Sequence, residues 1–222
     1  MVGVLPAARP SFFDACAERR LTWWPEIGIG FYPVEAGSEP YDAAYFERYQ
    51  RQAETEIGRA LMQARVDFVN RHFAGAVVDV GIGSGAFIDR RNAASDGRPN
   101  TFGFDVNPVA IGWLKARSLW IDPYRGQVPA IALWDVLEHI PDFAALLDRV
   151  SSWVFVSVPI FTNAQHVLRS KHYRKDEHVW YFTSEGLIRT FEGCGFDLAA
   201  MNSVETDLGR EDIGTFAFRR RA

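Results

Sequence analysis

Glycine occupies three alternate positions, Gly81, Gly83 and Gly85, directly after the apolar run VVDV at 77–80. That run is long enough for a buried parallel strand, and the residues after the glycines, AFIDRR, are compatible with a helix. A chain that passes from a strand through glycines into a helix presents backbone N–H groups to a ligand brought very close. The chemistry indicated is therefore the binding of a dinucleotide, a phosphate or another adenosine compound.

The same loop, GIGSGA, satisfies two cofactor patterns, GxGxG and the GxGxxA form of the dinucleotide fingerprint. In both patterns an acidic residue about twenty positions further on is expected to bind ribose hydroxyls. Asp105, at the end of the next expected strand, fits that position. The loop alone therefore leaves nicotinamide dinucleotides and other adenosine cofactors open.

Strands and helices alternate from Val77 onward, and these elements must position the glycine loop. Further strands are expected at 101–106, 129–134 and 153–161, and the helix after the first of them has a clear start signal at Asn107 and Pro108. The segments FDLAAMNSV and GTFAFRR are expected to close the chain as an antiparallel pair. This order predicts an α/β fold with a doubly wound sheet.

The N-terminal part of the chain has a different character. Residues 1–41 mix aromatic residues with scattered proline and glycine, and they are expected to form an irregular wrap. From Tyr41 to Phe73 apolar residues recur every three or four positions, which predicts one long amphipathic helix or two in tandem. We therefore expect a lid or cap at 1–73 on a core at 74–222, within one domain.

Composition narrows the class of protein. The 222 residues, 48% of them hydrophobic, are enough for one domain with a large core. The net charge of −4 argues against a protein that coats nucleic acid, although a local basic groove stays open. Cys16 and Cys194 are too few for a disulfide framework and lack metal-site spacing. With neither a signal sequence nor an apolar run of membrane-spanning length, a soluble cytoplasmic protein is expected.

Four segments carry a resemblance to a known family. They are VDVGIGSG at 78–85, GFDVNP at 103–108, WDVLEHIPDF at 134–143, and VSVPIF with DEHVWYFTSEGL at 156–161 and 176–187. In this order they resemble the class I S-adenosylmethionine-dependent methyltransferases, most closely the type 11/23-like branch with a D-V-L-E-H-I signature. The resemblance covers residues 75–222. It implies a Rossmann-like, mostly parallel, seven-stranded sheet with an antiparallel last strand, S-adenosylmethionine as cofactor, and methyl transfer as the reaction.

The resemblance also implies roles for single residues at the first two strands. The three glycines would let the backbone pass close to the methionine and ribose parts of the cofactor. Asp79 would face the cofactor's ammonium, directly or through water. Asp105 would bind the ribose hydroxyls, with Val106 and Asn107 packing near the adenine.

Further roles fall on the later segments. Asp122, in WIDPYRG, is the candidate for the acidic residue near the adenine amino group, and Trp134 and Asp135 would line the pocket at the end of the fourth strand. If the acceptor is a hydroxyl, a base must take its proton, and His139 and His178 are the candidates. Each histidine could instead have only a structural role in its own loop.

The acceptor class is narrowed by signatures that the sequence lacks. DNA amino-methyltransferases carry a D/N/S-P-P-Y/F/W signature at the fourth strand, where this chain has WDVL. Cytosine-C5 enzymes use a cysteine that follows a proline, and neither cysteine of this chain does so. A small or medium-sized acceptor, methylated on oxygen or nitrogen, is therefore expected, while a modified nucleobase or a sugar stays open.

Two other function classes account for parts of the sequence. An NAD(P)-dependent oxidoreductase would explain GxGxxA, but it leaves WDVLEHI and the terminal antiparallel pair unexplained. A catalytically silent methyltransferase fold that only binds a partner is opposed by the intact glycine loop, Asp79 and Asp105.

The loop KHYRKDEHVWYFT at 171–183 follows the fifth strand and is expected to cover the acceptor pocket. The basic residues of the overlapping segment RSKHYRKDEH at 169–178 form either a solvated face or a clamp for an anionic acceptor; they are Arg169, Lys171, Arg174 and Lys175. No metal site is expected, because His172, Glu177 and His178 lack suitable spacing and a third carboxylate.

Overall fold

The computed structural model describes residues 21–33, 42–95 and 97–222. Residues 1–20, which hold Cys16 and the first half of the expected wrap, lie outside the described residues, as does the stretch 34–41. The lid or cap expected at 1–73 stays a prediction.

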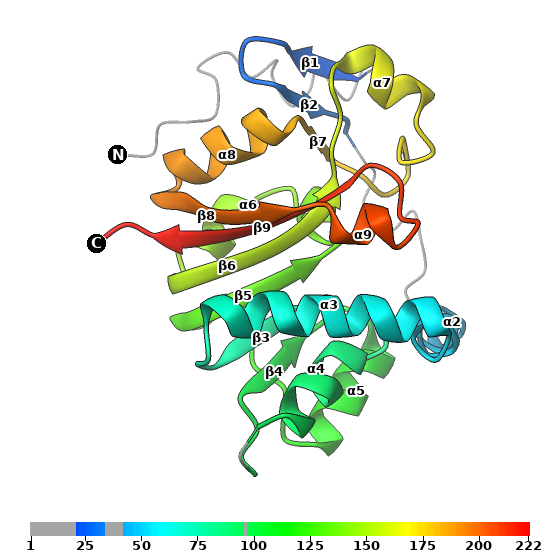
Figure 1. Cartoon of the computed structure of the whole chain (residues 1–222), viewed down its shortest axis with the longest axis vertical. Helices are drawn as coiled ribbons and strands as arrows, with labels where there is room; N and C mark the ends of the chain where they lie inside the picture. The colour runs from blue at the N-terminus through cyan, green and yellow to red at the C-terminus, as the bar shows by residue number, and fades with distance from the viewer. Residues whose placement is uncertain (1–20, 34–41, 96) are drawn as a thin grey trace.

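A six-stranded sheet forms the centre of the described chain, with the strand order β4-β3-β5-β6-β9-β8 (Figure 1). Strands β4, β3, β5 and β6 are parallel, whereas β9 is antiparallel to both of its neighbours, β6 and β8. The strands are β3 (Val77–Val80), β4 (Thr101–Phe104), β5 (Val128–Trp134), β6 (Val150–Pro159), β8 (Phe196–Asn202) and β9 (Ile213–Arg220). The predicted doubly wound, mostly parallel sheet with an antiparallel last strand is confirmed.

The sheet of the described residues has one strand fewer than the seven expected. Beside β4, the segment around Trp120 forms only an isolated parallel bridge to Gly103. The chain then turns, because the Asp122 carboxylate accepts a hydrogen bond from Tyr124 N–H at 2.9 Å and Pro123 has no N–H to continue a ladder. This edge of the sheet therefore ends in a bridge instead of a strand.

Two helices in tandem precede the sheet, α2 (Ala43–Ala53) and α3 (Glu56–His72), which decides between the two alternatives for this region. Thr55 separates them, since as the N-cap of α3 it accepts a hydrogen bond from Gly58 N–H at 3.0 Å. The other helices are α4 (Ala86–Ala93), α5 (Pro108–Ala116), the 3-10 helix η1 (Leu137–His139), α6 (Phe143–Leu147), α7 (Ala164–Arg169), α8 (Ser184–Gly193) and α9 (Val204–Asp207). Among the helices of the described ranges, none has both the length and the apolar character needed to cross a membrane.

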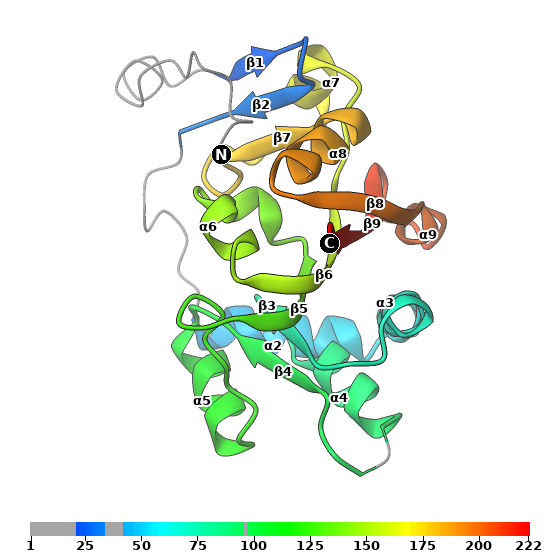
Figure 2. The same ribbon diagram turned by 90° about the vertical axis from the view of Figure 1, so that its left-hand side faces the viewer.

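The strands bury alternate side chains on the two faces of the sheet. Figure 2 shows α3 against one face of the sheet. On this face Ala130, Ala132 and Ala217 are small, and Phe68 and Val69 of α3 pack against them. The opposite face carries larger side chains from β5, β6 and β9, which pack against α6 and α8. Because helices cover both faces, a ligand finds access at the ends of the strands.

Residues 22–31 form a β-hairpin, so the expectation of an irregular wrap is wrong for this part. Strand β1 (Thr22–Trp24) pairs with β2 (Ile29–Phe31), and β2 pairs with β7 (Trp180–Phe182), both antiparallel. Gly28, with φ +78°, closes the turn between β1 and β2. Each strand has only three residues, too few to show a period of two, and β2 finds its second partner far along the chain. Because β7 is the last part of the 171–183 loop, the hairpin anchors this end of the loop (Figure 1).

Candidate functional site

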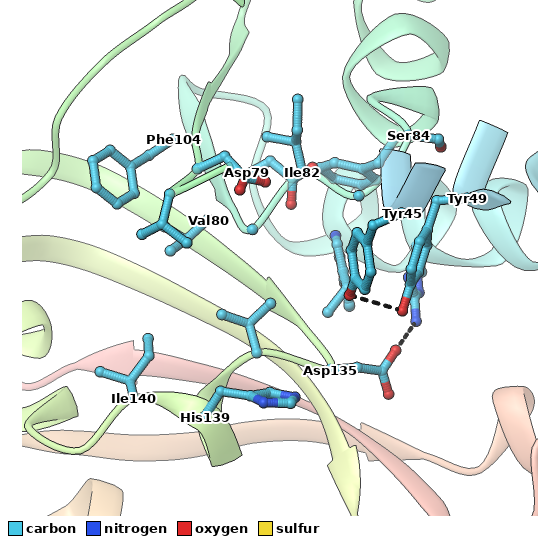
Figure 3. Close-up of a pocket in the computed structure, with 18 of the residues that line it drawn as sticks. Tyr45, Tyr49, Asp79, Val80, Ile82, Ser84, Phe104, Asp135, His139 and Ile140 are labelled. Carbon is cyan, nitrogen blue, oxygen red and sulfur yellow. Dashed lines mark hydrogen bonds and ion pairs between the residues drawn. The ribbon is translucent and has the colours of Figure 1, made fainter. Parts of the chain in front are cut away.

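A cavity of about 400 Å³ lies beyond the carboxyl ends of β3, β4 and β5. Its walls come from the ends of these strands, from η1 and the residues that follow it, and from α2 and α3. Figure 3 shows Asp79 on one side of the cavity and His139 on the opposite side. This is where a doubly wound sheet binds its ligand, and the volume suits an organic cofactor.

Asp79, the third residue of β3, places a buried carboxylate at the wall of this cavity. The residue is 1% exposed, and within the described chain its Oδ1 atom has no hydrogen-bond partner. Burial raises the pKa of the Asp79 carboxyl well above its usual range, while Arg65 opposes the shift and Asp105 adds to it. A buried carboxylate in this situation fits a cationic group of a ligand, which would hold the carboxyl in its charged form.

The glycine loop forms the floor of the cavity with its backbone. Gly81, Gly83 and Gly85 have φ of 74°, 55° and 77°, a region that other residues rarely adopt. At Gly81 a Cβ atom would lie 2.5 Å from Val136 Cγ2, and at Gly83 it would lie 3.3 Å from Tyr49 Cδ1. Gly81 and Gly83 line the cavity, whereas Gly85 is the N-cap residue of α4 and stays outside the described lining. The loop therefore lets a ligand approach the backbone at 81–83.

The end of β4 supplies a second carboxylate. Asp105 lines the cavity; burial raises the pKa of its carboxyl, and backbone N–H groups, among them that of Asn107 at 2.8 Å, oppose the shift. Val106 also lines the cavity and is 66% exposed. Asn107 instead caps α5, accepting from Val109 N–H, and its amide donates to Asp42 O at 3.1 Å. Asp105 and Val106 thus line the cavity, whereas Asn107 lies outside its described lining and holds the end of β4 through hydrogen bonds.

Two other expected cofactor residues differ in their placement. The described lining of the cavity does not include Asp122, whose carboxylate pairs with Arg125 at 3.2 Å; Tyr124 lines the cavity in its place. Trp134, the last residue of β5, does line the cavity, and its ring centroid lies 5.3 Å from that of Phe87. The structure therefore brings the Tyr124 ring, and not the Asp122 carboxylate, to this wall.

Helix α2 covers the glycine loop with two tyrosines (Figure 3). The ring centroids of Tyr45 and Tyr49 lie 4.7 Å apart, and the Tyr45 hydroxyl donates to Tyr49 Oη at 3.2 Å. The Arg48 guanidinium lies 5.0 Å from the centroid of the Tyr45 ring. The same guanidinium lies 5.7 Å from the centroid of the Tyr49 ring, so both rings already contact a cation of the protein.

Asp135 lies in a buried cluster of ion pairs. Its carboxylate accepts two hydrogen bonds from Arg210, both at 2.9 Å, and one from Arg65 at 3.0 Å. Both arginines also bind Glu205, which is fully buried, and Arg65 does so at 2.7 and 2.9 Å. Burial would raise the pKa of Asp135, but Arg210 and Arg65 outweigh it and lower the pKa. The cluster joins α3, α9 and the end of β5 and keeps a charged carboxylate at the cavity wall.

A second cavity, of about 280 Å³, adjoins the first. The two cavities share wall residues from α2, α3 and the end of β5, among them Tyr49, Asp135 and His139. The 171–183 loop contributes the residues His172, Arg174, Glu177 and His178 to the second cavity. A molecule in this cavity would therefore face a ligand of the first cavity across the shared wall.

His139 and His178 come together at the shared wall. Their ring centroids lie 4.7 Å apart with the rings nearly perpendicular, and His139 Nδ1 lies 3.1 Å from Glu177 O. Burial lowers the pKa of His139 to about 4; burial, with His139 and Arg174 nearby, lowers that of His178 to about 3. Both imidazoles are therefore neutral near neutral pH, so each keeps a nitrogen lone pair. The side chain of Glu138 joins this pair.

Sequence patterns missed the ion-pair cluster around Asp135. One signal was present, because Arg65 lies on the apolar stripe of α3, three residues before Phe68, where a charged side chain has to be buried and paired. Glu205 and Arg210 stand in a polar segment that offers no comparable signal.

Comparisons with known proteins agree with this geometry. A protein-family model described as a methyltransferase domain matches residues 45–200. Among solved structures, magnesium protoporphyrin IX methyltransferase (ChlM) from Synechocystis PCC 6803 with bound SAH is 16% identical, with 82% of this chain and 96% of that chain covered and a TM-score of 0.57. A SAM-dependent methyltransferase from Archaeoglobus fulgidus is 16% identical, with 79% and 99% covered and a TM-score of 0.55.

The fold is also similar to that of an enzyme with a different reaction. The [4+2]-cyclase SpnF is 12% identical, with 77% of this chain and 84% of that chain covered and a TM-score of 0.55. At these identities the likeness to solved structures shows the fold alone. Among curated proteins, no sequence matches this chain.

Proposed function

This chain belongs to the methyltransferase domain family, and from that premise we propose that it transfers a methyl group from S-adenosylmethionine to an oxygen or nitrogen atom of a small or medium-sized acceptor. The observation that carries the proposal is the Asp79 carboxylate, whose Oδ1 atom is buried beside the glycine loop without a hydrogen-bond partner in the described chain. The ammonium group of the methionine part supplies the missing partner.

The other residues of the first cavity fit the rest of this cofactor. The Asp105 carboxylate at the end of β4 accepts hydrogen bonds from the ribose hydroxyls, and Val106 and Tyr124 contact the adenine. The rings of Tyr45 and Tyr49 attract the sulfonium. The backbone at 81–83 allows the ligand to lie close, because no side chain projects from its two glycines.

Positioning is the main contribution of the chain to the reaction. S-adenosylmethionine supplies a methyl group that is bound to a sulfonium. The nucleophilic atom of the acceptor takes this methyl group, and the electron pair of the broken C–S bond stays on sulfur. The shared wall holds the acceptor of the second cavity next to the first cavity. A hydroxyl acceptor also loses a proton, and the neutral imidazole of His139 or His178 is the chain's candidate to receive it.

The second cavity supports a small or medium-sized acceptor. Its volume of about 280 Å³ takes one compact molecule or one part of a larger one. Two cations of its wall are already paired, Arg174 with Glu177 and Arg210 with Asp135. A neutral polar acceptor therefore fits this cavity better than a multiply charged anion.

Calorimetric titration tests the cofactor. We expect S-adenosylmethionine and its demethylated product, S-adenosylhomocysteine, to bind, and NAD⁺ to bind poorly. Tighter binding of NAD⁺ than of either sulfur nucleoside would contradict the proposal and favour the oxidoreductase. An acceptor screen by mass spectrometry, with nucleosides and sugars included, then tests transfer; binding without transfer to any acceptor would favour a silent binding protein.

Histidine variants test the acceptor side. His139→Ala and His178→Ala should lower turnover while leaving the affinity for S-adenosylhomocysteine nearly unchanged, because the cofactor is held by the ends of β3 and β4. His166→Ala is the matched control, since His166 pairs with Asp212 at 3.1 Å and lies outside the described linings of both cavities. Wild-type turnover in both test variants would remove the two histidines from the reaction.

A further inference from the structure

Three possible metal ligands gather where the two cavities meet. One donor atom each from Glu138, His139 and His178 lies within 4.8 Å of the other two. All three residues line the second cavity, and His139 also lines the first. Two imidazoles and one carboxylate are a donor set that Zn²⁺, Mn²⁺ and Fe²⁺ accept. We propose that these three side chains bind a divalent transition-metal ion at the wall between the cavities.

The fold brings the three ligands together through backbone contacts. Glu138 and His139 stand in η1, directly after β5, whereas His178 stands in the loop before β7. The Val179 N–H donates to Glu138 O at 2.8 Å, and Trp180 Nε1 donates to Ile140 O at 3.0 Å. These contacts hold the loop against η1, so the donor atoms are placed by the fold before any ion binds.

Two of the ligands are left unsatisfied by the protein. Glu138 is 1% exposed and His178 is 4% exposed. Within the described residues, Glu138 Oε2 and His178 Nδ1 are buried without a hydrogen-bond partner. Glu138 Oε1 and His178 Nε2 are 4.0 Å apart, too far for a hydrogen bond between them. A buried polar group without a partner lowers the stability of the fold. A ligand that both side chains can reach would supply the missing partner.

The hydrogen bond of His139 agrees with metal binding. If His139 donates its Nδ1–H to Glu177 O, at 3.1 Å, its Nε2 is left as the ligand atom.

These ligands are not the set that the loop sequence suggested. His172 Nε2 lies 2.9 Å from Glu211 O, and Glu177 pairs with Arg174. Of the loop residues considered for a metal, His178 alone joins this cluster, and the other two ligands come from η1. The fold thus brings together a different set of possible metal ligands from the one considered along the loop.

A metal ion at this position would activate the acceptor for the reaction. This role rests on the proposed methyl transfer. A divalent ion lowers the pKa of a hydroxyl that binds to it, so the acceptor oxygen would lose its proton to solvent and attack the methyl carbon. The new O–C bond would form as the C–S bond breaks, with the electron pair staying on sulfur. A nitrogen lone pair that is bound to the ion cannot accept that proton. In the metal-bound chain His139 and His178 would therefore be ligands, in place of the base role given to them above. This arrangement favours an oxygen acceptor over nitrogen.

Metal binding can be tested without the reaction. The full-length, untagged chain is stripped with EDTA, dialysed, and titrated with Zn²⁺, Mn²⁺ and Co²⁺ by calorimetry, with Mg²⁺ for comparison. We expect one bound ion per chain, visible Co²⁺ absorption bands, and weaker Mg²⁺ binding because magnesium prefers oxygen ligands. Glu138→Gln, His139→Ala and His178→Ala should each weaken binding at least about tenfold. His172→Ala, which removes an imidazole of the same cavity outside the cluster, should bind the ion as the wild type does.

Two results would overturn the proposal: no transition metal bound by the wild-type chain, or equal binding by the three ligand variants. Far-UV circular dichroism in EDTA reports whether each variant is folded; a histidine variant that fails this check is replaced by His139→Gln or His178→Gln. Titration of the wild-type chain with S-adenosylhomocysteine separates the two proposals. Metal binding without S-adenosylhomocysteine binding contradicts the proposed function alone, whereas the reverse result contradicts the metal site alone.

Discussion

Replacing Asp79 with asparagine should separate cofactor binding from stability. Asn keeps the shape of the side chain but cannot carry the charge that, in our proposal, faces the ligand's ammonium. A hydrogen bond to a charged group contributes about 1.5–3 kcal/mol, so the dissociation constant for S-adenosylhomocysteine should rise about 10- to 150-fold. 5′-Methylthioadenosine, which has no amino-acid part, should bind the variant and the wild type equally.

The same variant should not be less stable than the wild type at neutral pH. Because the pKa of Asp79 is raised in the folded chain, the folded state holds this proton more tightly than the unfolded state does. The contribution of Asp79 to the free energy of unfolding therefore falls as the pH rises from its usual pKa of 3.8 towards the raised value. Asp79→Asn should remove this decrease in the free energy of unfolding. Urea unfolding of the variant and the wild type at several pH values measures the difference.

Calorimetry with both ligands is the deciding assay. Asp89→Asn is the matched control, because Asp89 stands in the first turn of α4 and lies outside the described linings of both cavities. Its dissociation constants should equal those of the wild type. If Asp79→Asn also binds S-adenosylhomocysteine as tightly as the wild type, or if it weakens both ligands equally, the pairing of Asp79 with the ammonium is refuted.

Three further predictions concern the site and its support. Asp105→Ala should weaken S-adenosylhomocysteine binding by about 1.5–3 kcal/mol through lost ribose hydrogen bonds; an unchanged dissociation constant would remove that role. Gly83→Val should also weaken binding, because Gly83 has φ +55° and lines the cavity; wild-type affinity would argue against a close approach of the ligand. Arg65→Ala should lower the free energy of unfolding by about 3–5 kcal/mol in urea, since it leaves buried carboxylates short of a partner. Arg51→Ala, which removes an exposed ion pair, should cost less than about 1 kcal/mol, and equal losses would contradict the importance of burial.

The cofactor side of the site was predictable because its residues are local in sequence. Asp79 and the glycines belong to one strand, one turn and the start of one helix, and Asp105 directly follows the next strand. Strands β3 and β4 are parallel neighbours, so their carboxyl ends meet at one edge of the sheet. A motif together with the order of the strands is then enough to place both carboxylates at one cavity.

The short elements were not predictable in the same way. Strands β1 and β2 have three residues each, and their pairing depends on β7, which is remote in sequence. The seventh strand that the resemblance implied had no predicted position, and beside β4 the segment at Trp120 forms only a bridge before the chain turns at Pro123. The alternation of apolar and polar residues that indicates a strand becomes visible only over several residues. Segments of three residues are too short to show it.

The acceptor side is a product of the tertiary structure. The sequence singled out His139 and His178, but it could not show that they touch, or that Glu138 joins them. Their meeting depends on contacts between η1 and the loop before β7, among them the hydrogen bonds from Val179 N–H to Glu138 O and from Trp180 Nε1 to Ile140 O. A pattern of apolar residues shows which face of an element is buried, whereas the partner on the other side is chosen by strand order and by contacts between remote segments.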